Sequence, residues 1–253
     1  MITEIMYNLS LFLFEVPTGV ISDLVSRKLS IFLGFFCLIT GIFSLFLAEG
    51  FSFLALGQIT FALGTAFISG SDEALIYDSL LSKKREKEFT KIWSRIMLSS
   101  GIGCVFSLFI SGEMTKYFSI RGIIFINAIV FFIPLVLTLF LNDIRITSDK
   151  KETNYFLQIT ESAKIVFKSS EILLITSLIS LVLAFTKSVL WLSTPLFLRI
   201  DFPESEWGKI FSINRLIGVL ILFSIYKKLE KKNLNKLIIL FSVFYPILLL
   251  FFY

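Results

Sequence analysis

Residues 29–48 read LSIFLGFFCLITGIFSLFLA, a run that contains no charged side chain. A bilayer core of about 30 Å is crossed by about 20 residues of helix. The run has this length and does not alternate between polar and apolar residues, so it is not a barrel strand. It therefore predicts a helix that spans a membrane.

Seven further runs of the same kind flank this stretch. They cover residues 2–18, 51–70, 92–111, 120–141, 172–197, 207–226 and 237–253. No positively charged segment precedes the first run and no small-residue cleavage site follows it, so we interpret it as a span and not as a signal peptide. The predicted fold class is all-α, a polytopic membrane bundle with about eight transmembrane helices.

The composition agrees with a membrane protein. Of the 253 residues, 56% are hydrophobic and 17% are charged, whereas soluble domains carry about 25% charged residues. The net charge of +5 comes from short basic clusters between the apolar runs. These clusters favour a membrane surface as the partner, and nucleic acid is not expected.

The reactive side chains are few. The sequence has no histidine, and each of its two cysteines, Cys37 and Cys104, lies inside an apolar run. Both are interpreted as small buried hydrophobic residues. Neither a metal, a cofactor nor an enzymatic activity is expected, because the usual general base and metal ligands are missing.

The Lys and Arg residues fall mainly on one side of the predicted spans. Counting alternate connections, 18 lie on the side that follows the first span and four on the other, the four being Lys116, Arg121, Arg199 and Lys209. Basic connections stay in the cytoplasm. We therefore predict a multi-pass protein of the cell membrane with its basic, inner side in the cytoplasm and Met1 outside.

The connections also predict the domain organisation. Residues 1–141 form a first bundle of five spans, residues 142–171 a cytoplasmic linker, and residues 172–253 a partial second bundle of three spans. Apolar residues at helical spacing predict an amphipathic surface helix in the linker, with a solvated linker as the alternative. Residues 71–91 are interpreted as a second long, charged loop.

Two motifs carry a resemblance to a known family. Residues 15–28 read EVPTGVISDLVSRK and resemble the signature loop of the major facilitator superfamily, in which Gly, Asp and an Arg-Lys pair join two helices on the cytoplasmic side. Residues 69–80, SGSDEALIYDSL, are similar to a segment of its drug-efflux-like members. The resemblance implies an incomplete bundle corresponding to helices two to nine of twelve.

The same resemblance implies gating roles for six residues. We expect Gly19 to permit a close helix approach and Asp23 to pair with basic groups and to cap the next helix. The residues expected to act as a cytoplasmic clamp are Gly19, Asp23, Arg27, Lys28, Glu15 and Asp78.

Polar groups inside the runs are candidates for a substrate cavity. An ionisable side chain at membrane depth costs roughly 2.5 to 3.5 kcal/mol, so it needs a partner or an aqueous cavity. Helix packing and hydrogen bonding between helices are the alternatives for each candidate. The candidates are Gln58, Lys187, Trp191, Asn214 and Arg215.

Three glycines of the fourth run, Gly101, Gly103 and Gly112, are interpreted as sites of close helix packing.

The predicted function is secondary active transport of a small solute by alternating access, with efflux and proton coupling as the natural forms. The alternative is a non-functional, truncated transporter remnant. The lipid bilayer is the other expected partner, and the sequence does not specify an oligomeric state.

Overall fold

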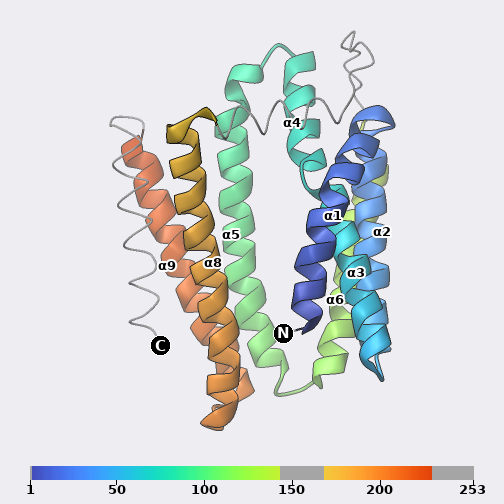
Figure 1. Cartoon of the computed structure of the whole chain (residues 1–253), viewed down its shortest axis with the longest axis vertical. Coiled ribbons are helices and arrows are strands. Elements are labelled where there is room, and N and C mark those ends of the chain that lie inside the picture. Colours follow the sequence, from blue (N-terminus) through green and yellow to red (C-terminus); the bar gives the residue numbers. More distant parts are fainter. Residues whose placement is uncertain (1, 143–167, 230–253) are drawn as a thin grey trace. The chain divides into compact units, whose positions relative to one another are not determined.

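The computed structural model describes residues 2–142 and 168–229, and every regular element among them is helical (Figure 1). The long helices are α1 (Ile2–Leu24), α2 (Arg27–Phe46), α3 (Phe51–Ile68), α5 (Phe89–Met114), α6 (Ile120–Leu139), α8 (Ser170–Arg199) and α9 (Glu204–Leu229). Two shorter elements, α4 (Ser71–Ser82) and the 3₁₀ helix η1 (Glu86–Glu88), lie between α3 and α5.

The predicted spans coincide with these helices. Each of the first seven predicted runs falls on one long helix and extends at most two residues beyond it. The run 237–253 and the amphipathic helix expected in the linker lie outside the described residues. In the described part of the chain, five helical segments are long and apolar enough to cross a membrane. The all-α, polytopic membrane fold is thus confirmed.

The prediction of a loop between the first two runs, at residues 19–28, is wrong. Helix α1 continues to Leu24, so Gly19 and Asp23 are helical and the turn before α2 is very short. Ser26 has an extended backbone and its hydroxyl accepts a hydrogen bond of 3.0 Å from the backbone N–H of Leu29. Ser26, and not Asp23, is therefore the N-cap of α2.

The prediction that residues 71–91 form a loop is also wrong. Helix α4 starts directly after Gly70, whose φ of +76° breaks the chain direction after α3. Glycine adopts this left-handed conformation without the steric cost that a side chain brings. The mixed charge of the segment indicates a loop, but the segment forms a helix whose apolar residues Leu75 and Leu80 are buried.

A cluster of three buried serines holds the Gly70 break in place. The hydroxyl of Ser71 lies 2.8 Å from that of Ser22 and 3.1 Å from that of Ser30. The Ser30 hydroxyl in turn donates to the carbonyl of Phe67, the residue before the end of α3. Helices α1, α2 and α3 are thus joined at the point where α4 begins.

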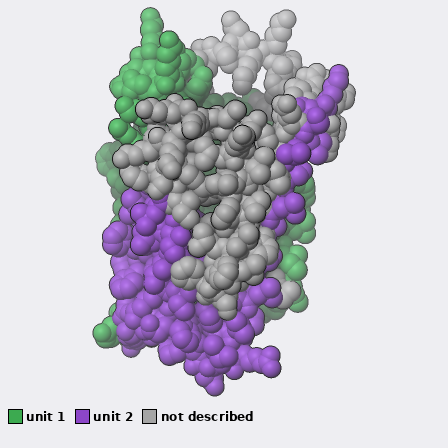
Figure 2. All heavy atoms as spheres, turned by 90° about the vertical axis from the view of Figure 1, so that its left-hand side faces the viewer, with its two compact units in different colours: residues 1–95, 117–150 green, residues 96–116, 151–253 purple. Residues whose placement is uncertain are grey.

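The chain forms two compact units (Figure 2). Unit 1 comprises Met1–Arg95 and Tyr117–Lys150, and unit 2 comprises Ile96–Lys116 and Lys151–Tyr253. The division into 1–141, 142–171 and 172–253 stays a prediction, because most of the linker lies outside the described residues.

In unit 1, helices α2 and α3 pack backbone against backbone through two pairs of glycines. A Cβ placed on Gly64 would lie 2.7 Å from the carbonyl oxygen of Gly34, and one on Gly41 would lie 3.0 Å from that of Gly57. Real Cβ atoms essentially never lie within 2.7 Å of a heavy atom in a neighbouring helix, and a contact of 3.0 Å is tighter than nine in ten of theirs. Small residues at this interface let the helices approach closely, which is how helices associate in lipid.

Helices α2 and α6 are tied together at both ends. The Lys28 ammonium donates a 2.7 Å hydrogen bond to the carbonyl of Leu139, the last residue of α6. At the opposite end, the Arg121 guanidinium donates to the carbonyl of Ala48, 3.2 Å away and just past α2. Carbonyls at the C-terminal end of a helix have no partner within the helix. Each basic side chain donates to such a carbonyl of the neighbouring helix, and its positive charge complements that helix's dipole.

The outward faces of the helices are apolar. Phe12, Phe106 and Phe140 are 73%, 63% and 78% exposed, and many other large apolar side chains are exposed with them. A soluble protein rarely displays apolar patches of this extent. These faces suit contact with lipid.

Candidate functional site

A group of charged residues joins three helices at the predicted inner end of unit 1. The Arg27 guanidinium lies 3.1 Å from the Asp78 carboxylate of α4 and 3.7 Å from that of Asp23 on α1. The side chains of Arg27 and Asp78 are 22% and 14% exposed. Three of the six predicted gating residues therefore meet in one partly buried cluster.

The other predicted gating residues lie elsewhere. Lys28 binds the end of α6, and Glu15 is exposed on α1. A Cβ on Gly19 would meet no atom within 4 Å. The expectation that Gly19 permits a close helix approach is therefore wrong.

Two predicted cavity residues share a face of α8. Lys187 and Trp191 are one helical turn apart, so their side chains are neighbours on the helix surface. Both are exposed in the described structure, Trp191 by 47%. An ammonium group beside an exposed indole ring is suited to bind an anionic or aromatic group.

The remaining cavity candidates differ in their burial. On α9, Asn214 is buried, with 9% of its surface exposed, whereas the neighbouring Arg215 is exposed. The two side chains therefore do not act on the same face. Gln58 is partly buried on α3. It belongs to unit 1, whereas the candidates on α8 and α9 belong to unit 2.

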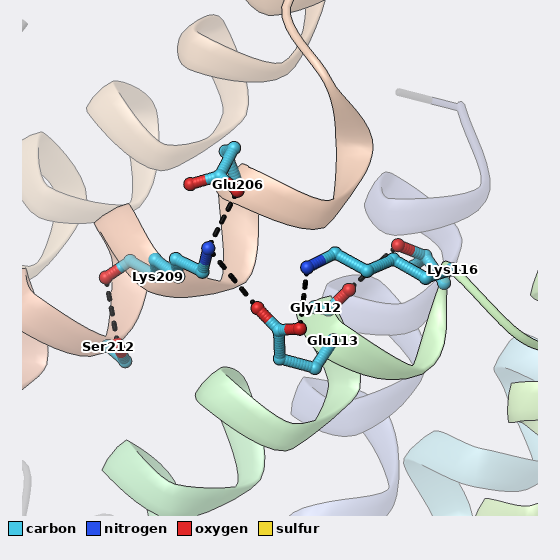
Figure 3. A network of polar contacts seen from close by, with 7 residues as sticks. Gly112, Glu113, Lys116, Glu206, Lys209 and Ser212 are labelled. Carbon is cyan, nitrogen blue, oxygen red and sulfur yellow. Dashed lines mark hydrogen bonds and ion pairs between the residues drawn. The ribbon is translucent and has the colours of Figure 1, made fainter.

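Sequence reasoning missed an ion-pair network in unit 2, at the ends of α5 and α9 (Figure 3). The Glu113 carboxylate lies 2.7 Å from the ammonium of Lys116 and 3.2 Å from that of Lys209. Lys209 in turn lies 2.7 Å from Glu206. Each acid stands three residues before a lysine, a spacing that predicts the two local pairs but not the link between helices; Lys116 lies in the turn just after α5.

The helices beneath this network are in direct backbone contact. A Cβ on Gly112 would lie 2.8 Å from the Cα of Gly208, and a Cβ on Gly101 would lie 2.9 Å from the side chain of Val219. Close packing at Gly101 and Gly112 therefore matches the interpretation from the sequence. At Gly103 a Cβ would meet no atom within 4 Å.

Helices long and apolar enough to span a membrane, packed through glycines and tied by charged groups at their ends, define a polytopic helical membrane protein. The family model of the Major Facilitator Superfamily matches residues 4–253. No curated protein and no solved structure matches the chain. The chain belongs to the Major Facilitator Superfamily, whose members are membrane transporters.

Proposed function

We propose that this protein carries a small solute across the membrane by secondary active transport, with access alternating between the two sides. The observation that carries the proposal is the 3.1 Å ion pair between Arg27 of α2 and Asp78 of α4. It lies in the two segments that resemble superfamily motifs, at the end of the bundle predicted to face the cytoplasm.

The pair has the strength that a reversible clamp needs. A partly buried, charge-assisted pair contributes about 1 to 3 kcal/mol. Since 1.4 kcal/mol is a tenfold change in an equilibrium, its loss or formation changes the ratio of two conformations by roughly tenfold. Asp23, 3.7 Å from Arg27, offers the guanidinium a second carboxylate when Asp78 moves away.

The link between Glu113 and Lys209 is the proposed counterpart on the outer side. It joins the end of α5 to the start of α9, and both of these segments belong to unit 2. A link between two helices at the outer end holds these ends together, and we expect it to open when solute is exchanged outside. Both groups are about one third exposed, so the link is weak and readily broken.

For the solute, we propose contact with Lys187 and Trp191 on α8. We propose efflux as the direction, because residues 69–80 resemble a segment of efflux-like members. A proton gradient is the proposed driving force. An anionic or aromatic solute is the expected class, because an ammonium and an indole ring present these affinities on one face.

Transport by purified protein in proteoliposomes tests the proposal. A pH step across the vesicle drives accumulation of labelled organic anions and aromatic dyes, and an ionophore collapses the gradient. Asp78→Asn is expected to slow transport about tenfold, which corresponds to about 1.4 kcal/mol. Glu73→Gln, an exposed acid on the same helix, is the matched control and is expected to leave the rate unchanged.

Two results would contradict the proposal. If the folded protein takes up every solute at the same rate as empty vesicles, transport is excluded. Accumulation that survives collapse of the gradient would exclude proton coupling. Lys187→Ala should raise KM for the anionic solutes, whereas the neighbouring Ser188→Ala should not.

A further inference from the structure

Four lysines lie in the connection between α4 and α5 and in the first turn of α5. Lys83, Lys84, Lys87 and Lys91 are all exposed. In residues 2–142 and 168–229, no carboxylate lies within ion-pairing distance of Lys83, Lys84 or Lys87. These four lysines define the basic turn, in which Lys83, Lys84 and Lys87 have no ion-pair partner among the described residues, whereas Lys91 interacts electrostatically with Glu88.

Arg85 lies within the same turn but behaves differently. Its guanidinium binds Glu88 through two hydrogen bonds of 2.7 and 2.6 Å. This pairing raises the pKa of Arg85 above its ordinary value. Glu88 is thus paired with Arg85, and the charges of Lys83, Lys84 and Lys87 remain available to a partner.

The backbone at Lys84 is unusual for a lysine. Its φ is +56°, and the N–H of Arg85 donates to the carbonyl of Leu80 over 2.8 Å, closing the C-terminus of α4. Glycine is the usual residue at this position because a Cβ is strained there. With lysine instead of glycine, the chain keeps a positive charge here at the cost of local backbone strain. This points to a role for the charge of Lys84.

Three aromatic rings lie beside the basic turn. Tyr77 packs edge-on against Phe89 with ring centroids 5.4 Å apart, and Phe89 stacks on Trp93 at 6.1 Å. Tyr77 is 42% exposed. Tyrosine and tryptophan gather at the boundary between hydrocarbon and headgroups. The aromatic rings therefore place the neighbouring lysines at the depth of the lipid phosphates.

We propose that the basic turn binds the headgroups of anionic phospholipids in the adjoining leaflet. The chemistry is complementary, because clustered lysines next to a membrane helix attract negatively charged lipid surfaces. The aromatic rings favour lipid over a soluble acidic protein as the occupant, because they fix the turn at the membrane boundary. The interaction is independent of which solute the protein carries.

Quenching of Trp93 by brominated lipids tests this proposal on the full chain. In Trp191→Phe/Trp207→Phe protein, Trp93 is the remaining indole. In mixed vesicles we expect brominated phosphatidylglycerol to quench it more strongly than brominated phosphatidylcholine at equal mole fraction. The preference should disappear in about 1 M salt, where the screening length is about 3 Å.

Charge variants of the turn supply opposite expectations. Each neutralised lysine, as in Lys83→Gln or Lys87→Gln, should lower the preference for the anionic lipid about five-fold. Glu86→Gln, which removes an exposed acid from the same turn, should raise it. Lys116→Gln, at the other end of α5, should leave it unchanged.

Lys84→Gly separates charge from folding. Glycine relieves the left-handed backbone, so this variant should resist unfolding at least as well as the parent while losing about five-fold in lipid preference. Equal quenching by both lipids in the parent protein would overturn the proposal. So would a preference that Lys83→Gln, Lys84→Gly and Lys87→Gln all leave intact, because the quenching would then come from general proximity to lipid.

Discussion

At the scale of single residues, partly buried charge is concentrated in one small group. Arg27 and Asp78 are less exposed than the partners in the other ion pairs of the described structure. Removing one partner of a partly buried pair leaves the other charge without compensation, which costs more than the pair itself contributes. Single substitutions and paired substitutions should therefore differ clearly.

A double-mutant cycle measures this difference. Arg27→Gln and Asp78→Asn should each destabilise the protein, and the double variant should be less destabilised than their sum by about 1 to 3 kcal/mol. The free energy of unfolding in a denaturing detergent mixture is the measurement. Additive effects would mean that the two groups do not interact in the membrane.

For the pair between Glu113 and Lys209, we expect a smaller effect on stability. Because both groups are about one third exposed, Glu113→Gln should change stability by less than about 1 kcal/mol. It should nevertheless raise the accessibility of a cysteine placed at Ser205 on α9, because the outer ends then separate more often. Glu206→Gln, which breaks only a pair within α9, is the control and should leave the labelling rate unchanged.

At the scale of helices, the contact between α2 and α3 is the tightest described in unit 1. Gly64→Ala places a methyl group 2.7 Å from the Gly34 carbonyl oxygen and should destabilise the protein by about 1 to 3 kcal/mol, the usual cost of overpacking. Gly103→Ala adds the same methyl in open space. It should be neutral or stabilising by up to about 1 kcal/mol, since alanine favours helix. Thermal unfolding of the two variants, measured side by side, checks this, and equal midpoints would contradict it.

The helices themselves could be predicted from hydropathy, because each long run lacks charge and must satisfy its backbone hydrogen bonds internally. Helix α4 could not, since Asp72, Glu73 and Asp78 give it a polar composition. The partners of Lys28 and Glu113 could not either, because they lie on helices distant in sequence. For the α2 and α3 contact a signal was present: Gly34 and Gly41, like Gly57 and Gly64, stand seven residues apart, which places each pair on one helix face.

At the scale of the whole molecule, the distribution of basic residues makes a topological prediction. In protein with Cys37→Ser and Cys104→Ser, a cysteine at Lys116 should react with a membrane-impermeant maleimide added to intact cells, whereas one at Lys84 should react only after permeabilisation. Equal reaction at both positions in intact cells would reject the predicted orientation. The glycine contacts of unit 1 do not depend on this orientation.

The left-handed residue Gly70 divides a helical stretch of 32 residues, Phe51–Ser82. The 18 residues of α3, at 1.5 Å each, reach about 27 Å and nearly cross the hydrocarbon by themselves. Helix α4 then starts where the hydrocarbon ends and lies at the level of the headgroups. Its acidic side chains, Asp78 among them, incur none of the insertion penalty that the same residues would carry a few turns earlier, so α4 tolerates charges that α3 excludes.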